Sequence, residues 1–135
     1  MKDMAAALIR KGNRILLVHN NKHGSLRVEP PGGKREDGET LEGCLVREVM
    51  EELGCKVRVS GEFGVYETNS PEGPFRVRMY WAEVVSGVPS LQDNEIGKIT
   101  KLGYYTLEEM QEFQASGELV PNLCSALKDL RFYLR

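Results

Sequence analysis

The stretch that decides the fold runs from Gly33 to Cys55 and reads GKREDGETLEGCLVREVMEELGC. Within it, Glu48, Glu51 and Glu52 recur at spacings of three and four residues, which would place them on one surface of an α-helix, roughly 5–6 Å apart. Two unit charges at that separation repel by about 3 kcal/mol at an effective dielectric constant near 20. Because hard oxygen ligands suit Mg²⁺ and Mn²⁺, a shared divalent cation would remove this repulsion. The stretch therefore predicts a metal site built on a helix.

The residues on either side of the glutamates set the ends of this helix. The segment Pro-Pro-Gly-Gly at 30–33 excludes helix before it, because proline lacks the backbone donor and glycine favours other conformations. Thr40 is a suitable N-cap, and Gly54 is a suitable C-terminal stop. Four apolar residues between them share one helical face: Leu41, Leu45, Val49 and Leu53. We therefore expect an amphipathic helix whose apolar face packs on the core.

The complete pattern resembles the signature of Nudix hydrolases: glycine, five residues, glutamate, seven residues, arginine-glutamate, an aliphatic residue, any residue, two glutamates, any residue, glycine and an aliphatic residue. The matching positions are Gly33, Glu39, Arg47, Glu48, Val49, Glu51, Glu52 and Gly54. Cys55 stands where an aliphatic residue is usual, and a buried thiol behaves as a small hydrophobe. Many relatives carry an aromatic residue and a leucine just before the glycines, where this chain has Val28 and Pro30. That departure concerns substrate stacking near the loop and leaves the metal chemistry unchanged.

The resemblance implies roles for the motif residues. The implied metal ligands are Glu48 and Glu52 as the principal carboxylates, with Glu51 and the backbone carbonyl of Gly33 beside them, and the implied cofactor is Mg²⁺ or Mn²⁺. Arg47 and Glu39 resemble a pair that orients the site without touching substrate. The alternative for Arg47 is an ordinary surface pair with Glu51 at i, i+4.

Three further residues are candidates for the site. Relatives often place another acid on a later loop, as a metal ligand or general base, and Glu95 is the candidate here, with Asp93 as its rival. The predicted catalytic set is therefore Glu48, Glu52, Arg47, Glu39 and Glu95. Lys34 and Arg35, which follow the glycines, could contact phosphate.

Aromatic and histidine residues outside the motif have two interpretations. Trp81, Tyr80 and Tyr66 could stack on a base, although aromatic residues in alternating strands usually belong to the core. His19 and His23 flank a polar loop without ligand partners in sequence, so we expect both to be surface residues.

Composition places the chain among globular proteins. Its 135 residues with 41% hydrophobic content suit one domain, residues 1–135, with a proper core. No apolar run of 18 residues and no signal-peptide pattern is present, and the three cysteines show no Cys-x-x-Cys spacing, so we expect a cytoplasmic protein without a membrane span. Residues 29–54 hold eight acidic and three basic residues, a local charge of −5 within a total of −2. This distribution favours a cation site and argues against binding a nucleic-acid polymer.

The remaining chain predicts a mixed sheet with helices on its faces. We expect a hairpin over 4–20, strands over 26–28, 57–59, 63–66, 75–84 and 102–105, a helix opened by the capping box of Thr106 and Glu109, and a last helix over about 123–133. This agrees with the α/β (α+β) fold that the resemblance implies, a Nudix-type α/β/α sandwich with a mixed sheet.

The leading interpretation is a Mg²⁺-dependent pyrophosphohydrolase that cleaves the diphosphate of a nucleoside diphosphate linked to another group. A nucleoside triphosphate, including a damaged one, is the first substrate class. ADP-ribose is the alternative, because Pro71 lies sixteen positions after Cys55, where ADP-ribose-cleaving relatives often carry proline; dinucleoside polyphosphates follow. The alternative from another functional class is a catalytically silent nucleotide-binding module. Such modules commonly lose motif glutamates, whereas this chain keeps an acidic residue at every acidic position of the motif, which argues against this alternative. We expect a monomer or homodimer whose partner is a nucleotide-type small molecule.

Overall fold

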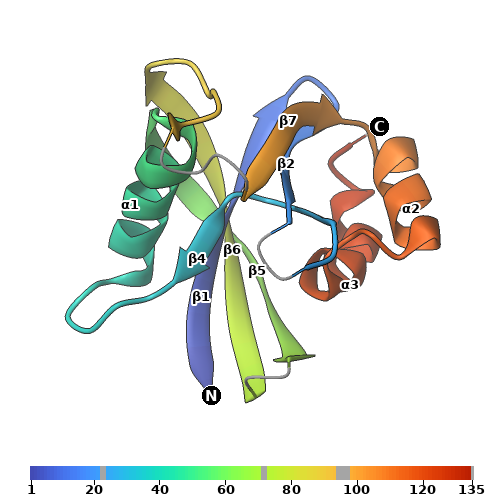
Figure 1. Ribbon diagram of the computed structural model, residues 1–135, viewed down its shortest axis with the longest axis horizontal. Helices are drawn as coiled ribbons and strands as arrows, with labels where there is room; N and C mark the ends of the chain where they lie inside the picture. Colours follow the sequence, from blue (N-terminus) through green and yellow to red (C-terminus); the bar gives the residue numbers. More distant parts are fainter. Residues whose placement is uncertain (22–23, 71–72, 94–97, 135) are drawn as a thin grey trace.

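The computed structural model describes residues 1–21, 24–70, 73–93 and 98–134. Within these residues, seven strands and three helices follow one another along the chain (Figure 1). The elements are β1 (Lys2–Lys11), β2 (Arg14–Asn20), β3 (Arg27–Glu29), β4 (Gly32–Lys34), α1 (Leu41–Leu53), β5 (Lys56–Ser70), β6 (Gly73–Ser86), β7 (Ile99–Tyr105), α2 (Leu107–Ser116) and α3 (Pro121–Leu130). No described helix has the length and apolar character needed to cross a membrane.

Strand β1 is the centre of the sheet. The strands run in the order β3-β2-β1-β6-β5, while β4 adds to β1 and β7 adds to β2. Strand β1 is parallel to β6 and antiparallel to β2 and β4, so the sheet is mixed. In Figure 1, α1 covers one face of the sheet, and α2 and α3 cover the other. The predicted α/β/α sandwich is confirmed.

The alternation of side chains along the strands creates two separate cores. On β1, Ala5 and Ala7 pack with α1, whereas Ala6 and Leu8 pack with α3. The α1 core contains Cys44, Leu45, Val49, Leu53 and Cys55, all completely buried. The expected apolar stripe of the motif helix and the burial of Cys55 are thus confirmed.

Both ends of α1 are capped as the sequence predicts. The Thr40 hydroxyl accepts a hydrogen bond from the Gly43 backbone N–H at 3.0 Å. At the other end, Gly54 has a φ of 67°, and its N–H donates to the Met50 carbonyl at 2.9 Å. These two caps satisfy backbone groups at the helix ends and fix where α1 begins and ends.

The glycine segment before α1 differs from the prediction. It was expected to be a loop, but Gly32–Lys34 forms the short strand β4, which pairs with Met4–Ala6 of β1. The approach is close enough that a Cβ on Gly32 would collide with the Ala5 carbonyl oxygen. The absence of a side chain on Gly32 therefore lets the backbones of β4 and β1 approach each other. The secondary-structure propensity of glycine alone does not predict this strand pairing.

Two further boundaries differ from the prediction. The expected strands 57–59 and 63–66 form the single strand β5, whose pairing with β6 shifts register beside Gly61 and Gly64. Helix α3 begins at Pro121 and ends at Leu130, in place of the predicted 123–133. A proline in the first helical turn needs no intrahelical donor, so it starts the helix early.

Candidate active site

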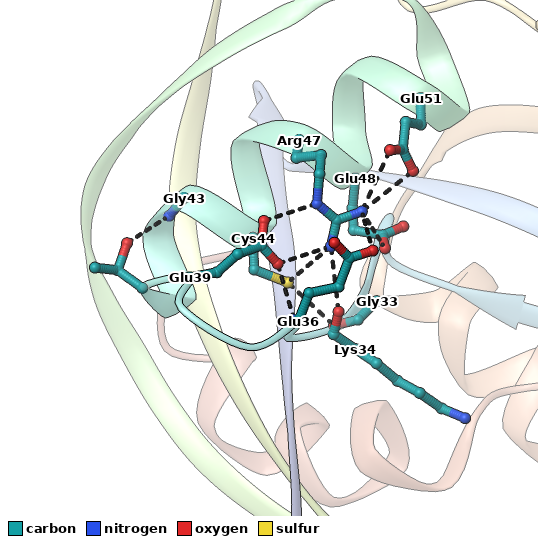
Figure 2. Close-up of polar contacts among 10 residues, drawn as sticks. Gly33, Lys34, Glu36, Glu39, Gly43, Cys44, Arg47, Glu48 and Glu51 are labelled. Atoms are coloured by element: carbon teal, nitrogen blue, oxygen red, sulfur yellow. Dashed lines mark hydrogen bonds and ion pairs between the residues drawn. The ribbon is translucent and has the colours of Figure 1, made fainter.

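Arg47 is the centre of a polar network that joins α1 to the segment before it (Figure 2). Its guanidinium forms a bidentate pair with Glu39, with Nε–Oε2 at 2.7 Å and Nη2–Oε1 at 2.9 Å. Nη2 also donates to the Lys34 carbonyl at 3.3 Å. The predicted pairing of Arg47 with Glu39 is confirmed, and the contact with Lys34 fixes the end of β4 against the helix.

Arg47 also contacts the glutamates of its own helix. Nη1 lies 3.0 Å from Glu48 Oε1 and 3.3 Å from both carboxylate oxygens of Glu51, while Glu36 approaches at 3.7 Å. The i, i+4 pair with Glu51 therefore coexists with the pair between Arg47 and Glu39. The repulsion expected among the motif carboxylates is partly offset by this one guanidinium.

The network changes the acidity of its members. Hydrogen bonds from the Arg47 guanidinium and the Glu36 backbone N–H lower the pKa of Glu39 to about 2. Burial raises the pKa of the Cys44 thiol to about 11, and the nearby charges of Glu39 and Glu48 add to the shift. Glu39 therefore remains ionised, and the Cys44 thiol remains protonated, at neutral pH.

Glu48 and Glu52 both meet the backbone of β4. A Cβ on Gly33 would lie 2.7 Å from each carboxylate oxygen of Glu48, so only glycine leaves room for that carboxylate. Glu52 is buried, and its Oε1 accepts a hydrogen bond from the Gly32 N–H at 3.3 Å. Glu51 instead is half-exposed and directed toward Arg47.

The donor set of this region fits a hard divalent cation. Two carboxylates, from Glu48 and Glu52, and the carbonyl of Gly33 are oxygen donors of the kind that Mg²⁺ and Mn²⁺ prefer. Across the described part of the chain, however, no three His, Cys, Asp or Glu side chains are already grouped in the manner of a metal site. The residues have the right chemistry, but their carboxylates are held by different partners.

A cavity of about 630 Å³ lies beside this network. One wall, the motif wall, consists of Gly32, Gly33, Lys34 and Glu48; the floor includes Met4, Ala6, Phe75 and Val77; the opposite wall, the far wall, includes Arg27, Glu29, Val120, Pro121 and Asn122. An apolar floor between two polar walls suits an organic group attached to a charged one.

The far wall is assembled from distant segments. Val28 N–H donates to the Glu118 carbonyl at 2.7 Å, and Val120 N–H donates to the Val28 carbonyl at 3.0 Å, so β3 lies against the start of α3. Asn20 donates to Glu29 Oε1 at 2.8 Å, and Asn122 is only 8% exposed. Sequence reasoning missed this wall. Its one local signal was a polar residue, Asn122, at a buried position of an otherwise apolar helix face.

The structure separates the two basic residues that were expected to contact phosphate. Lys34 lines the cavity, with Nζ 5.3 Å from the centroid of the Phe75 ring. Arg35 is paired with Asp3 at 3.3 Å and does not line the cavity. The prediction for Arg35 therefore lacks support from the geometry, whereas Lys34 lies at the cavity wall.

None of the three aromatic residues considered for base stacking lines this cavity. Tyr80 is buried in the α1 core. Trp81 packs edge-on against Phe63 and Tyr133, with its ring centroid 5.3 Å from each. Tyr66 donates to Asp129 at 2.8 Å. The aromatic residue that does line the cavity is Phe75, which the sequence analysis did not single out.

The prediction that His19 is a surface residue is wrong. Its ring is buried and lies 2.6 Å from the Tyr105 hydroxyl, and burial lowers the pKa of the imidazole. His19 lies on β2, which places it inside the sandwich. The polar residues that follow it in the sequence therefore did not predict its burial.

Asp93 is exposed. His23, Glu95 and Pro71 lie outside the described residues, so the proposals that involve them gain nothing from the geometry.

Comparison with known proteins gives one consistent family. The model of the NUDIX domain matches residues 2–123. A NUDIX hydrolase from Nitrosomonas europaea has a similar structure, with a TM-score of 0.82 at 23% identity over 99% of this chain and 90% of that one. The MutT protein from Methanosarcina mazei also has a TM-score of 0.82, at 18% identity over 98% of this chain and 94% of its own.

Curated relatives match shorter stretches. An ADP-ribose pyrophosphatase from Methanocaldococcus jannaschii is 35% identical over 59% of this chain and 49% of its own length. An 8-oxo-dGTP diphosphatase from Escherichia coli is 33% identical over 58% of this chain and 61% of its own. An NAD-capped RNA hydrolase from Vibrio parahaemolyticus is 43% identical over 42% of this chain and 22% of its own. The chain thus spans about half the length of the first of these relatives and less than a quarter of the last.

Proposed function

The chain belongs to the Nudix family, and on that premise we propose that it is a Mg²⁺- or Mn²⁺-dependent pyrophosphohydrolase that cleaves the diphosphate of a nucleoside diphosphate linked to another group. The observation that carries this proposal is the position of Glu48, which lines the cavity at the one point where Gly33 leaves room for its carboxylate. The Glu48 carboxylate thus borders the space that a substrate would fill. A nucleoside triphosphate, intact or damaged, is the first substrate class to test.

Each motif residue has a distinct proposed task. Glu48, Glu52 and the Gly33 carbonyl would hold the cation, with Glu51 joining them if it leaves Arg47. Arg47 and Glu39 would position the cation ligands without binding the cation themselves. The Arg47 guanidinium donates a hydrogen bond to the Lys34 carbonyl and so holds the end of β4. A bound divalent cation neutralises phosphate charge, orients the phosphoanhydride and lowers the pKa of water.

Lys34 supplies a positive charge on the motif wall that can approach a phosphate group. Its ammonium lies over Phe75, at the side of the cavity where β1 begins. Glu95, which precedes β7 in the sequence, is proposed as an additional ligand or general base, with Asp93 as the alternative. Glu95→Gln should then lower kcat more than it weakens substrate binding.

ADP-ribose is the second candidate substrate, and the observation favouring it is the relative named ADP-ribose pyrophosphatase, at 35% identity over 59% of this chain. Dinucleoside polyphosphates come after it. A catalytically silent module remains the alternative from another class. We also propose that the protein acts in the cytoplasm, as a monomer or homodimer, on small nucleotides and not on nucleic-acid polymers.

A panel of substrates tests the proposal. Wild-type protein should be incubated with Mg²⁺ and nucleoside triphosphates, ADP-ribose or dinucleoside polyphosphates, and the phosphate-containing products should be identified. The proposal predicts cleavage within a diphosphate linkage for at least one of these classes. A folded protein that cleaves none of them, with either Mg²⁺ or Mn²⁺, would contradict it.

A further inference from the structure

One end of the cavity floor brings two ammonium groups to the same aromatic ring. Lys2 Nζ lies 5.8 Å and Lys34 Nζ 5.3 Å from the centroid of the Phe75 ring. The two lysines come from β1 and β4, whereas Phe75 comes from β6, lines the cavity and is only 6% exposed. The negative face of an aromatic ring attracts a cation that lies within about 6 Å of its centroid. Phe75 therefore holds two positive charges at this end of the cavity.

Strand pairing adds a hydroxyl group beside the same ring. In the register of the sheet, Phe75 lies between Lys2 on β1 and Thr68 on β5. Paired residues on neighbouring strands share a face of the sheet, and Thr68 lines the cavity together with Phe75. A threonine hydroxyl can donate a hydrogen bond to an anionic oxygen. We call this group of four residues the cationic end of the cavity: Lys2, Lys34, Thr68 and Phe75.

The acidic residues next to this group in the sequence lie on the other face of the sheet. Asp3 follows Lys2 on β1, and its carboxylate pairs with Arg76 Nε at 2.9 Å. Glu67 stands opposite Arg76 in the register of β5 and β6, so it shares that face. The charges of Asp3 and Glu67 are therefore directed away from the cationic end.

From this arrangement we infer that the cationic end is an anion-binding subsite for the third phosphate of a nucleoside triphosphate, with Lys2 as the residue that discriminates it. The inference rests on the proposed function, in which the first two phosphates meet the motif wall. Lys34 joins the two regions, because its backbone follows Gly33 and its side chain ends over Phe75. ADP-ribose has two phosphates and leaves the subsite empty, so the subsite favours a triphosphate over ADP-ribose.

Binding of inorganic tripolyphosphate in EDTA tests the subsite without hydrolysis or metal. Titration of ¹⁵N-labelled wild-type protein at millimolar ligand should shift the backbone NMR signals of Lys2, Thr68 and Phe75. Lys2→Gln removes the charge, and it should raise the Kd about three- to fivefold, near the upper limit for an exposed ion pair. Lys2→Arg should keep the wild-type Kd within about twofold, because it keeps the charge.

Lys11→Gln is the matched control. Lys11 is also exposed and lies at the other end of β1, with Nζ 5.4 Å from the centroid of the Tyr104 ring. Its substitution removes the same charge from a similar contact and should leave the Kd for tripolyphosphate unchanged. No binding to wild-type protein, or equal Kd values for folded Lys2→Gln and Lys11→Gln, would overturn the inference.

Kinetics with Mg²⁺ separate this result from the proposed function. Lys2→Gln should raise KM for a nucleoside triphosphate by about the same factor, while ADP-ribose, as substrate or competitor, should bind both proteins equally. Cleavage of triphosphates that is insensitive to Lys2→Gln would refute the subsite and leave the hydrolase intact. Tripolyphosphate binding that depends on Lys2, in a protein that cleaves no substrate in the panel, would support the subsite and refute the hydrolase.

Discussion

The two walls of the cavity are built in opposite ways. The motif wall and the network behind it come from one continuous segment, residues 32–52, and are held by ion pairs between 2.7 and 3.7 Å around Arg47. The far wall joins β2, β3 and the start of α3 through buried hydrogen bonds. Charge is thus concentrated in one continuous segment on the motif wall, whereas the polar groups of the far wall are brought together only by the fold.

This difference predicts different consequences of mutation. Substitutions in the motif wall should change the rate for every substrate, because they alter the charges that meet the phosphates. Substitutions in the far wall should change the preference among substrates and leave metal dependence in place. A motif-wall variant that changed only base preference would contradict this division.

The largest expected effect is that of Glu52→Gln. The side chain is buried against the Gly32 backbone, and the substitution keeps its shape while removing its charge. We expect kcat to fall by about 10²-fold or more, as happens when one group that stabilises transition-state charge is removed. Steady-state kinetics with Mg²⁺ measure this effect, and circular dichroism controls for folding. A folded variant with wild-type kcat would remove Glu52 from the site.

A smaller loss of rate is expected for Glu39→Gln. Glu39 holds Arg47 through two hydrogen bonds and lies outside the lining of the cavity. Residues that orient a metal site from outside typically affect it by about 10- to 100-fold. We expect such a loss in kcat/KM for all substrates alike. A loss confined to one substrate would show that the two walls are coupled.

Metal binding should stabilise the native protein by a moderate amount. A ligand at ten times its Kd that binds only the folded state adds about 1.4 kcal/mol, which corresponds to a rise of several degrees in Tm. Differential scanning fluorimetry with Mg²⁺ or Mn²⁺ should show this rise in wild-type protein and a reduced rise in Glu48→Gln. Identical melting curves with and without saturating metal would count against the site.

The smallest effect concerns stability in acid. Because the pKa of Glu39 is lowered to about 2 from a usual 4.5, its interaction with Arg47 stabilises the fold fully above the unfolded pKa and is lost as the pH falls through the folded one. The advantage of wild-type protein over Glu39→Gln should therefore be constant at neutral pH and shrink between about pH 4.5 and 2. Urea denaturation at a series of pH values measures it. A difference independent of pH would show that the carboxylate charge contributes nothing.

The contrast between the walls also explains which parts of the molecule the sequence predicted. Helix α1, its caps, its apolar face and the Arg47–Glu39 pairing all depend on spacings within about 20 residues, and all are confirmed. The strand β4 was missed because its formation depends on the close approach of Gly32 to Ala5, 27 residues earlier in the chain. Local periodicity carries no information on such tertiary contacts.

The same reason accounts for His19 and the far wall. His19 was assigned to the surface from its polar neighbours in sequence, yet its place on β2 buries it beside Tyr105, 86 residues away. Glu29 and Asn122 line the same cavity because β3 pairs with β2 and is hydrogen-bonded to the segment before α3. The metal-binding roles of the motif glutamates stay predictions.

The most direct test of the account is ³¹P NMR of GTP incubated with wild-type protein in the presence of Mg²⁺ and, separately, with EDTA. The account predicts that resonances of GMP and pyrophosphate, or of GDP and phosphate, grow only when the metal is present. Hydrolysis that proceeds equally in EDTA would contradict the metal chemistry of the motif wall. No hydrolysis of GTP, UTP or ADP-ribose in either condition would contradict the assignment of the cavity as the active site of a pyrophosphohydrolase.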